Sequence, residues 1–174
     1  MSYRDHIGSF SLPLATLIVA PACLIVFSND YTVWWGLDPI FDILLFTLGF
    51  FLILSGFTLL IICIRMFSSI GKGTLAPWAP TQNLVVSGLY RHTRNPMISG
   101  VLIVLLGESI LLSSFSIFIW FIVALVVNHV YFIKSEEPGL LERFGDEYPI
   151  YIERVPRWIP RRTPWYPEFK QEDT

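Results

Sequence analysis

The sequence predicts an all-α, polytopic membrane protein with four transmembrane helices, both termini in the cytoplasm and an amphipathic, helical C-terminal tail. Hydrophobic residues make up 53% of the 174 residues and charged residues only 15%, whereas a soluble domain carries about 25% charged residues. Four long apolar stretches approach or exceed the roughly 20 residues that cross a bilayer. A chain of this length is expected to form one domain over residues 1–174.

The first two spans are predicted at about residues 10–27 and 40–64. The first carries no charge, and Pro13 and Pro21 are expected to bend or tilt it. Its apolar character resembles that of a signal peptide, but it lacks a clear small-residue cleavage site and more spans follow. The second span is long enough to tilt.

The last two spans are predicted at about residues 96–113 and 114–133. Only a tight turn at Leu112–Ser116 separates them, so they are expected to form an antiparallel hairpin. The polar connection before them, residues 66–94, includes Gly71-Lys72-Gly73-Thr74. This motif lacks the earlier glycine and the preceding strand of a phosphate-binding loop, so a nucleotide site is excluded there.

Positive charges predict the orientation of the spans. All 12 Lys and Arg residues lie in the N-terminal stub, the second connection or the C-terminal tail. Four spans place these three segments on one side of the membrane, which the positive-inside rule makes cytoplasmic.

The stretch 88–100 combines charge with the expected start of the third span. Asn95 is a good helix N-cap and Pro96 fits the first helical position. The free N–H groups of that helix, together with Arg91 and Arg94, could bind a carboxylate or phosphate. An equally good interpretation at this point is a basic membrane flank with an ordinary helix cap.

The hairpin should bring polar groups from distant segments to one membrane depth, where such residues usually face a bundle interior or a water-filled cavity. The expected group comprises Arg91, Arg94, Asn95, Asn128, His129, Lys134, Glu136 and Glu137. Glu108 lies further along the third span and is interpreted as structural rather than catalytic. No metal site is expected, because the three histidines lack the paired spacing of zinc ligands.

The tail is not expected to be disordered. Apolar residues at approximately helical spacing run from Leu140 to Val155, with Gly145 able to end one helix and Asp146 able to cap the next. These segments, residues 134–160, are predicted to lie on the membrane and cover the cytoplasmic ends of the spans. Arg157, Trp158 and the following arginines are placed at the headgroups, with a plain lipid anchor as the alternative.

Several short motifs occur in a characteristic order. They are Gly88-Leu89-Tyr90-Arg91, Arg94-Asn95-Pro96 with Gly100, Glu136-Glu137, Phe144-Gly145-x-x-Tyr148-x-x-Tyr151 and Val155-Pro156. In this order and spacing they resemble the isoprenylcysteine carboxyl methyltransferase family, to which phospholipid N-methyltransferases are related. The resemblance covers about residues 81–160. Eukaryotic members usually have histidine where this chain has Asn95, and asparagine is familiar there in bacterial relatives.

The resemblance implies an integral membrane enzyme that moves a methyl group from S-adenosylmethionine to a lipophilic or small-molecule acceptor, in a bacterial plasma membrane with the active site facing the cytoplasm. The expected partners are that acceptor and membrane lipids, and no nucleic acid. Carried over by position, the family's cofactor-binding residues are Gln82, Asn83, Leu84, Val85, Tyr90, Asn95, Pro96, Glu136 and Glu137. Arg94, His129 and Lys134 are candidates for substrate binding. Direct displacement needs alignment and a dry site rather than a covalent nucleophile, so no catalytic residue is assigned.

Two further positions depart from the pattern of the family. Ile98 replaces a tyrosine common in the family, and Phe132 replaces an arginine tied to the substrate carboxylate. The second departure argues against a prenylcysteine carboxylate. A phospholipid N-methyltransferase and a non-enzymatic scaffold with a degenerate site therefore remain as alternative functions.

Overall fold

The computed structural model describes residues 15–32, 34–70 and 83–167, without the side chains of residues 67–69. These residues form helices joined by turns and irregular segments, with no strand among them, so the all-α prediction is confirmed. The N-terminal part of the first predicted span, the motif at 71–74 and Gln82 lie outside the described residues. The helices are η1 (Ala15–Val19), α2 (Ala20–Ser28), α3 (Pro39–Ser69), η2 (Gly88–Arg91), α4 (Pro96–Leu111), α5 (Phe115–Tyr131), η3 (Phe132–Glu136), α6 (Glu137–Phe144) and α7 (Glu147–Arg154).

Two of these helical stretches are long and apolar enough to cross a membrane, namely Pro39–Met66 and Phe115–Phe144. Ala15–Ser28 and Pro96–Leu111 are apolar but shorter. Only 22% and 17% of the most apolar windows of the two long helices are buried. The core helix of a soluble protein would instead be mostly buried, so these exposed apolar faces suit a lipid environment.

The chain divides into two compact units. The first, here named the bundle unit, contains the described residues of Ser11–Leu60 and Ile98–Asn128. The second, the tail unit, contains the described residues of Ile61–Met97 and His129–Thr174.

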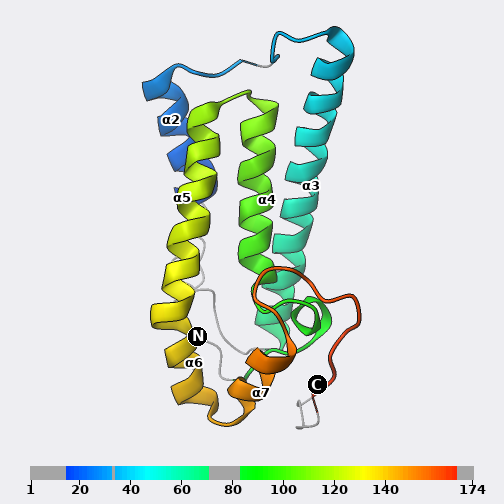
Figure 1. Ribbon diagram of the computed structural model, residues 1–174, viewed down its shortest axis with the longest axis vertical. Coiled ribbons are helices and arrows are strands. Elements are labelled where there is room, and N and C mark those ends of the chain that lie inside the picture. Colours follow the sequence, from blue (N-terminus) through cyan, green and yellow to red (C-terminus); the bar gives the residue numbers. More distant parts are fainter. Residues whose placement is uncertain (1–14, 33, 71–82, 168–174) are drawn as a thin grey trace. The chain divides into compact units, whose positions relative to one another are not determined.

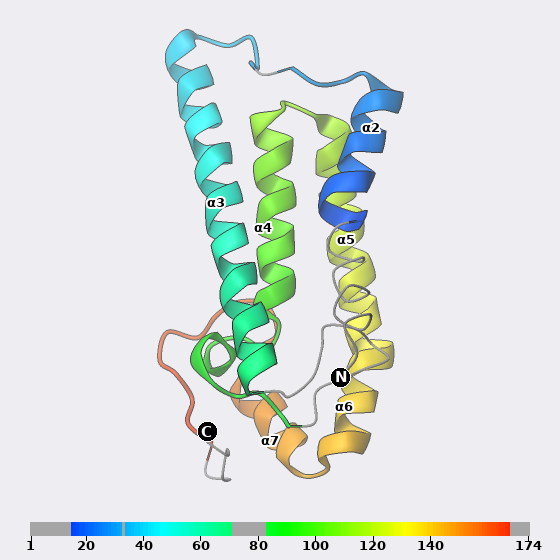
Figure 2. The same ribbon diagram turned by 180° about the vertical axis from the view of Figure 1, so that it is seen from behind.

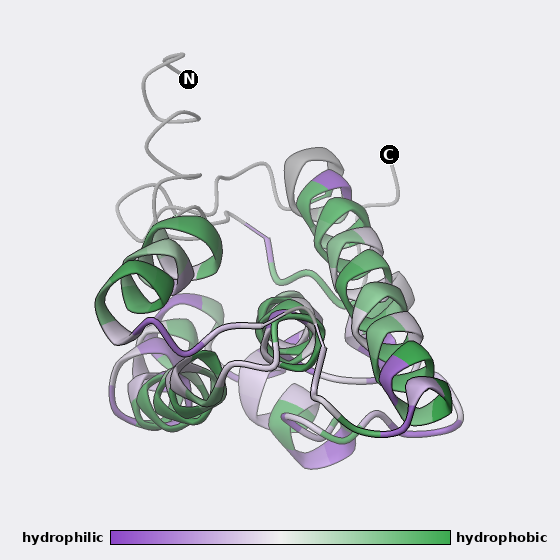
Figure 3. Ribbon diagram, turned by 90° about the horizontal axis from the view of Figure 1, so that it is seen from above, coloured by the Kyte–Doolittle hydropathy of each residue, from purple (hydrophilic) through white to green (hydrophobic). Residues whose placement is uncertain are grey.

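In the bundle unit, α4 and α5 run antiparallel and are joined by a short turn before Phe115, as predicted (Figures 1 and 2). The helices of this unit are hydrophobic along most of their length (Figure 3). Val104, Leu105 and Ile117 are fully buried between them. Apolar residues on the other faces of α3 and α5 are exposed, as expected for helices that contact lipid.

Hydrogen bonds to Asp30 join the segment between α2 and α3 to the start of α5. Asp30, in the segment between α2 and α3, accepts hydrogen bonds from the Ser116 N–H at 2.9 Å and the Ser116 hydroxyl at 2.8 Å. It also accepts one from the Ser114 hydroxyl at 3.1 Å. The carboxylate therefore caps the first turn of α5 from outside the helix, where free N–H groups favour an anion.

In the tail unit, the helix that begins with α5 continues through η3 into α6. It ends at Phe144, where Gly145 adopts a φ of +53°, as its predicted role as a helix terminator requires. Asp146 precedes α7 as predicted, but its side chain makes no capping hydrogen bond, so the predicted cap is wrong. Val86, Tyr148, Tyr151 and Val155 form the buried core of this unit.

Candidate functional site

The segment that joins η2 to α4 is attached to the C-terminal tail residue by residue. The helix α4 begins at Pro96, as predicted. Before it, each of the five residues from Tyr90 to Arg94 forms a hydrogen bond with the tail. The bonds are Tyr151 Oη to Tyr90 O (2.7 Å), Trp165 N to Arg91 O (3.1 Å), Arg161 N to His92 O (2.9 Å), Thr93 Oγ1 to Arg157 O (2.8 Å) and Arg94 N to Pro156 O (2.9 Å). The conformation of this segment therefore depends on residues 61 to 74 positions later.

His92 and Arg91 also use their side chains in this attachment. His92 Nδ1 lies 2.8 Å from the Arg161 carbonyl oxygen, and because a carbonyl only accepts, Nδ1 carries the proton. The Arg91 guanidinium carbon lies 4.4 Å from the centre of the Tyr166 ring. Arg91, expected from the sequence to bind an anion, is thus held by an aromatic side chain of the tail.

Tyr90 is buried, with 5% of its surface exposed. Its hydroxyl is hydrogen-bonded to the Cys63 thiol, and its carbonyl oxygen accepts from Tyr151. Burial raises the pKa of Tyr90 well above its ordinary value, and the neighbouring Glu136 carboxylate raises it further. Tyr90 is therefore a buried, neutral residue that is held at both its hydroxyl and its carbonyl oxygen.

Glu137 is the centre of a partly buried ion cluster. Its carboxylate accepts from Arg94 Nη1 at 2.6 Å, from Arg157 Nε at 3.0 Å and from Arg157 Nη2 at 2.8 Å to each oxygen. The side chains of Arg94, Glu137 and Arg157 are 9%, 18% and 18% exposed. Charge-assisted bonds in such surroundings are strong, and loss of Glu137 would leave two arginines without their counter-charge.

Glu136, directly before Glu137, has a different environment. It is the last residue of η3, a π-helical turn of a kind often found at functional sites. Burial raises the pKa of the Tyr90 and Tyr148 hydroxyls, and the Glu136 carboxylate is close enough to both to raise it further. Within the described ranges no hydrogen bond or ion pair engages this half-buried carboxylate, so it can accept a cationic or hydroxyl-bearing ligand.

Two other polar atoms of the tail unit are buried without a hydrogen-bond partner among the described residues. They are Arg94 Nε and Ser87 Oγ. Orphaned buried polar atoms are rare in folded proteins and are often explained by a bound ligand or water. A ligand that carries both a carboxylate and an ammonium group would match the free Arg94 Nε and the free Glu136 carboxylate.

The other residues predicted for the cofactor are spread through the same unit. Val85 and Pro96 are buried, whereas Asn83, Leu84 and Asn95 are half-buried. Leu84 packs against the core that contains Tyr148 and Tyr151. Their contact with a cofactor stays a prediction.

The residues predicted for the substrate differ in their surroundings. His129 accepts a hydrogen bond on Nδ1 from Trp158 Nε1 at 3.1 Å, which requires a neutral ring. Trp158 also packs on Phe132, with ring centres 5.7 Å apart. Lys134 is exposed, and Asn128, expected in the same polar group, donates to the Ala124 carbonyl of its own helix.

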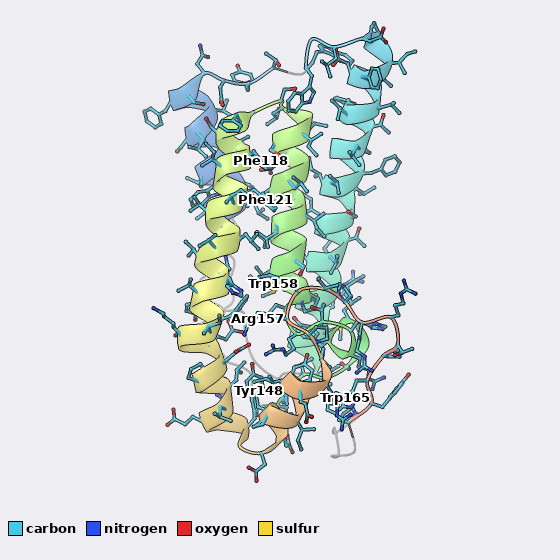
Figure 4. The ribbon with its side chains drawn as sticks, viewed as in Figure 1. Phe118, Phe121, Tyr148, Arg157, Trp158 and Trp165 are labelled. Atoms are coloured by element: carbon cyan, nitrogen blue, oxygen red, sulfur yellow. The ribbon has the colours of Figure 1, made fainter. Side chains whose placement is uncertain are left out.

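Sequence reasoning missed the inward role of the tail side chains. Arg157 was placed at lipid headgroups, but it turns toward Glu137, and Tyr148, Arg157, Trp158 and Trp165 come from one stretch of the tail (Figure 4). The sequence places Tyr151 in an apolar pattern and in a family motif but assigns no partner to its hydroxyl, which donates to the Tyr90 carbonyl oxygen. The Tyr-x-x-Tyr spacing was the available signal, since buried tyrosines usually find a partner for the hydroxyl.

The long apolar helices suit a membrane protein, and the tail unit carries a charged, partly buried site. The profile of the phospholipid methyltransferase family matches residues 40–147, which is more than half of the chain, so the protein belongs to this family. The chain is also 36% identical over 77 residues to the protein-S-isoprenylcysteine O-methyltransferase of Schizosaccharomyces pombe. That match covers 44% of this chain and only 33% of the yeast protein. Membership of the methyltransferase family, predicted from the motifs, is confirmed.

Proposed function

We propose that the protein is a membrane methyltransferase that moves a methyl group from S-adenosylmethionine to a lipophilic or small-molecule acceptor. The family match supports the reaction class. The observation that carries the proposal is the pair of unused groups in the tail unit, the Glu136 carboxylate and Arg94 Nε. The methionine part of the cofactor carries a carboxylate and an ammonium group, which these two residues complement.

The residues have separate tasks in this proposal. Arg94 Nε binds the carboxylate by a charge-assisted hydrogen bond. Glu136 binds the ammonium group or the ribose hydroxyls. Leu84, Val85 and Tyr90 form the apolar wall that excludes water, beside the polar side chain of Asn83.

The cofactor supplies a methyl group on a positively charged sulfur, ready for direct displacement. The protein's contribution is then to align the acceptor and to keep the site dry, which can account for a large part of the rate enhancement. None of the residues described here needs to form a covalent bond.

The topology proposed is four spans with both termini and the site on the cytoplasmic side. The two long helices and the two shorter apolar helices supply the spans, and the positive charges all fall on one side of such an arrangement. Asn95 before the proline favours a bacterial plasma membrane as the location.

The residue at position 132 bears on whether the methyl acceptor is a carboxylate or an amine. The S. pombe relative is named for isoprenylcysteine, but Phe132 is a buried apolar residue where the resemblance expects an arginine for a carboxylate. The description of the family profile favours a phospholipid amine as a second candidate acceptor.

The cofactor assignment is tested by calorimetry with S-adenosylhomocysteine on the full chain in detergent. We expect saturable micromolar binding to the wild type, and its loss in Glu136→Ala at an unchanged melting temperature. Glu142→Ala, which removes an exposed carboxylate from α6, is the matched control and should bind as the wild type does. Equal affinity of the Glu136→Ala and Glu142→Ala variants would refute the site.

The acceptor is tested by incubating membranes that contain the protein with methyl-labelled S-adenosylmethionine. Alkali-labile label indicates a carboxyl methyl ester, whereas alkali-stable label in phospholipid headgroups indicates N-methylation. Membranes that contain the Glu136→Ala variant provide the background. No label above this background would contradict methyltransferase activity on membrane components.

A further inference from the structure

Arg157 joins three separate segments of the tail unit. Its guanidinium binds Glu137 at the start of α6, and its carbonyl oxygen accepts from Thr93 at 2.8 Å. The residue before it, Pro156, accepts from the N–H of Arg94 at 2.9 Å. The segment before α4, the start of α6 and the tail therefore meet at one residue, which lies outside the residues matched by the family profile.

The Arg157 guanidinium makes a forked contact. It uses two nitrogens, and both oxygens of Glu137 accept from it at 2.8–3.0 Å. A planar guanidinium held in this way fixes the direction of the carboxylate as well as its position. Arg94 then occupies one of the same oxygens through Nη1 at 2.6 Å.

The contacts of Glu137 determine which groups of Arg94 and Glu136 remain available to a ligand. With Nη1 held by Glu137, Arg94 is fixed in a position that leaves Nε buried and unpartnered among the described residues. With Glu137 occupied by two arginines, Glu136 is the acidic neighbour still available to a ligand.

We propose that Arg157 is a positioning residue of the cofactor site, acting through Glu137 on Arg94 and Glu136. This rests on the function proposed above. Arg157 itself does not touch the cofactor: it keeps Glu137 away from the ligand and holds Arg94 in its binding position.

The test compares S-adenosylhomocysteine binding by the full-length wild type, Arg157→Gln, Glu137→Gln and the double variant, well below their melting temperatures. Arg162→Gln, which removes an exposed arginine from the same tail, is the matched control. We expect Arg157→Gln to weaken binding about tenfold, because Glu137 loses the forked contact that fixes its direction and is then free to turn with Arg94 away from the position in which Arg94 binds. Arg162→Gln should bind like the wild type.

The double variant separates positioning from independent effects. If Arg157 acts through Glu137, the double variant binds no more weakly than the weaker single variant, because both substitutions break the same contact. Losses that multiply in the double variant would overturn the proposal, and so would unchanged affinity in Arg157→Gln.

A conservative variant covers the case in which Arg157→Gln does not fold. Arg157→Lys keeps the charge but loses the two-nitrogen fork, so its affinity should lie clearly below that of the wild type. Wild-type affinity in Arg157→Lys would overturn the forked positioning role. Absence of binding by the folded wild type would instead remove the proposed function, so the two failures are distinguishable.

Discussion

Gly107 lies at a close approach of α3 and α4, and its replacement by alanine should destabilise the bundle unit. A Cβ added at Gly107 would lie 2.8 Å from the Gly49 carbonyl oxygen and 2.9 Å from the Ile53 backbone nitrogen. The contact is reciprocal, because a Cβ at Gly49 would lie 3.0 Å from the Gly107 carbonyl oxygen. Backbone atoms cannot rotate away as a flexible side chain can, so the helices would have to separate.

The size of the effect follows from two opposing terms. Overpacking a close contact costs about 1–3 kcal/mol, and helices associate in lipid largely through such close packing of small residues. Alanine has a higher helix propensity than glycine by up to about 1 kcal/mol, which offsets part of the cost. The net loss is about 1–2 kcal/mol, or a fall in melting temperature of about 3–6 °C for a chain of this size.

The assay is thermal unfolding of the purified protein in one detergent at one heating rate. Gly139→Ala is the matched control, because Gly139 lies in α6 with no atom within 4 Å of an added Cβ. That variant should unfold at the wild-type temperature or slightly above it. A Gly107→Ala melting temperature at or above that of Gly139→Ala would refute the close packing of α3 against α4.

Two further predictions concern hydrogen bonds. The hydrogen bond from Ser28, with those from Ser116 and Ser114, holds the pKa of Asp30 well below its usual range. The Asp30 carboxylate therefore stabilises the fold at neutral pH. This stabilisation is lost as the pH falls below about 4 toward the folded-state pKa. Asp30→Asn should lower the melting temperature at pH 7 by a few degrees and reduce the loss of stability on acidification; an unchanged acid response would contradict the cap. Tyr151→Phe removes the donor to the buried Tyr90 carbonyl. It should lower the free energy of unfolding by about 1–2 kcal/mol and weaken S-adenosylhomocysteine binding. Tyr166→Phe keeps the exposed ring beside Arg91 and should change neither quantity.

The helical elements could be predicted from the sequence because their signals are local. Pro96 fits the first position of a helix, and α4 begins there. Gly145 tolerates a left-handed conformation, and α6 ends before it. The turn between α4 and α5 likewise falls where two apolar stretches meet. Continuation of the α5 helix into α6 was not predicted, because the charged residues Lys134, Glu136 and Glu137 resemble the end of a span.

The contacts of the site could be predicted only in part. The motifs identified the segment before Pro96 and the two glutamates, but they did not show which tail residues hold them. Tyr151 donates a hydrogen bond to the backbone carbonyl of Tyr90, 61 residues earlier. Because every residue has a backbone carbonyl, such a bond does not constrain the residue type at the accepting position. Arg157 was placed among the lipid headgroups because a partner distant in sequence cannot be recognised from charge alone.

The two adjacent glutamates show why position on a helix matters more than residue type at this site. Successive residues of a helix point in directions about 100° apart, so adjacent side chains face different principal partners. Glu137 begins α6 and faces two arginines, whereas Glu136 ends the π-helical turn, close enough to raise the pKa of Tyr90. The two glutamates are therefore expected to have different roles. Glu137→Gln should weaken the attachment of the tail. Glu136→Gln should abolish S-adenosylhomocysteine binding while the tail stays in place. Equal effects of the two substitutions on S-adenosylhomocysteine affinity and on melting temperature would show that the pair acts as one acidic patch.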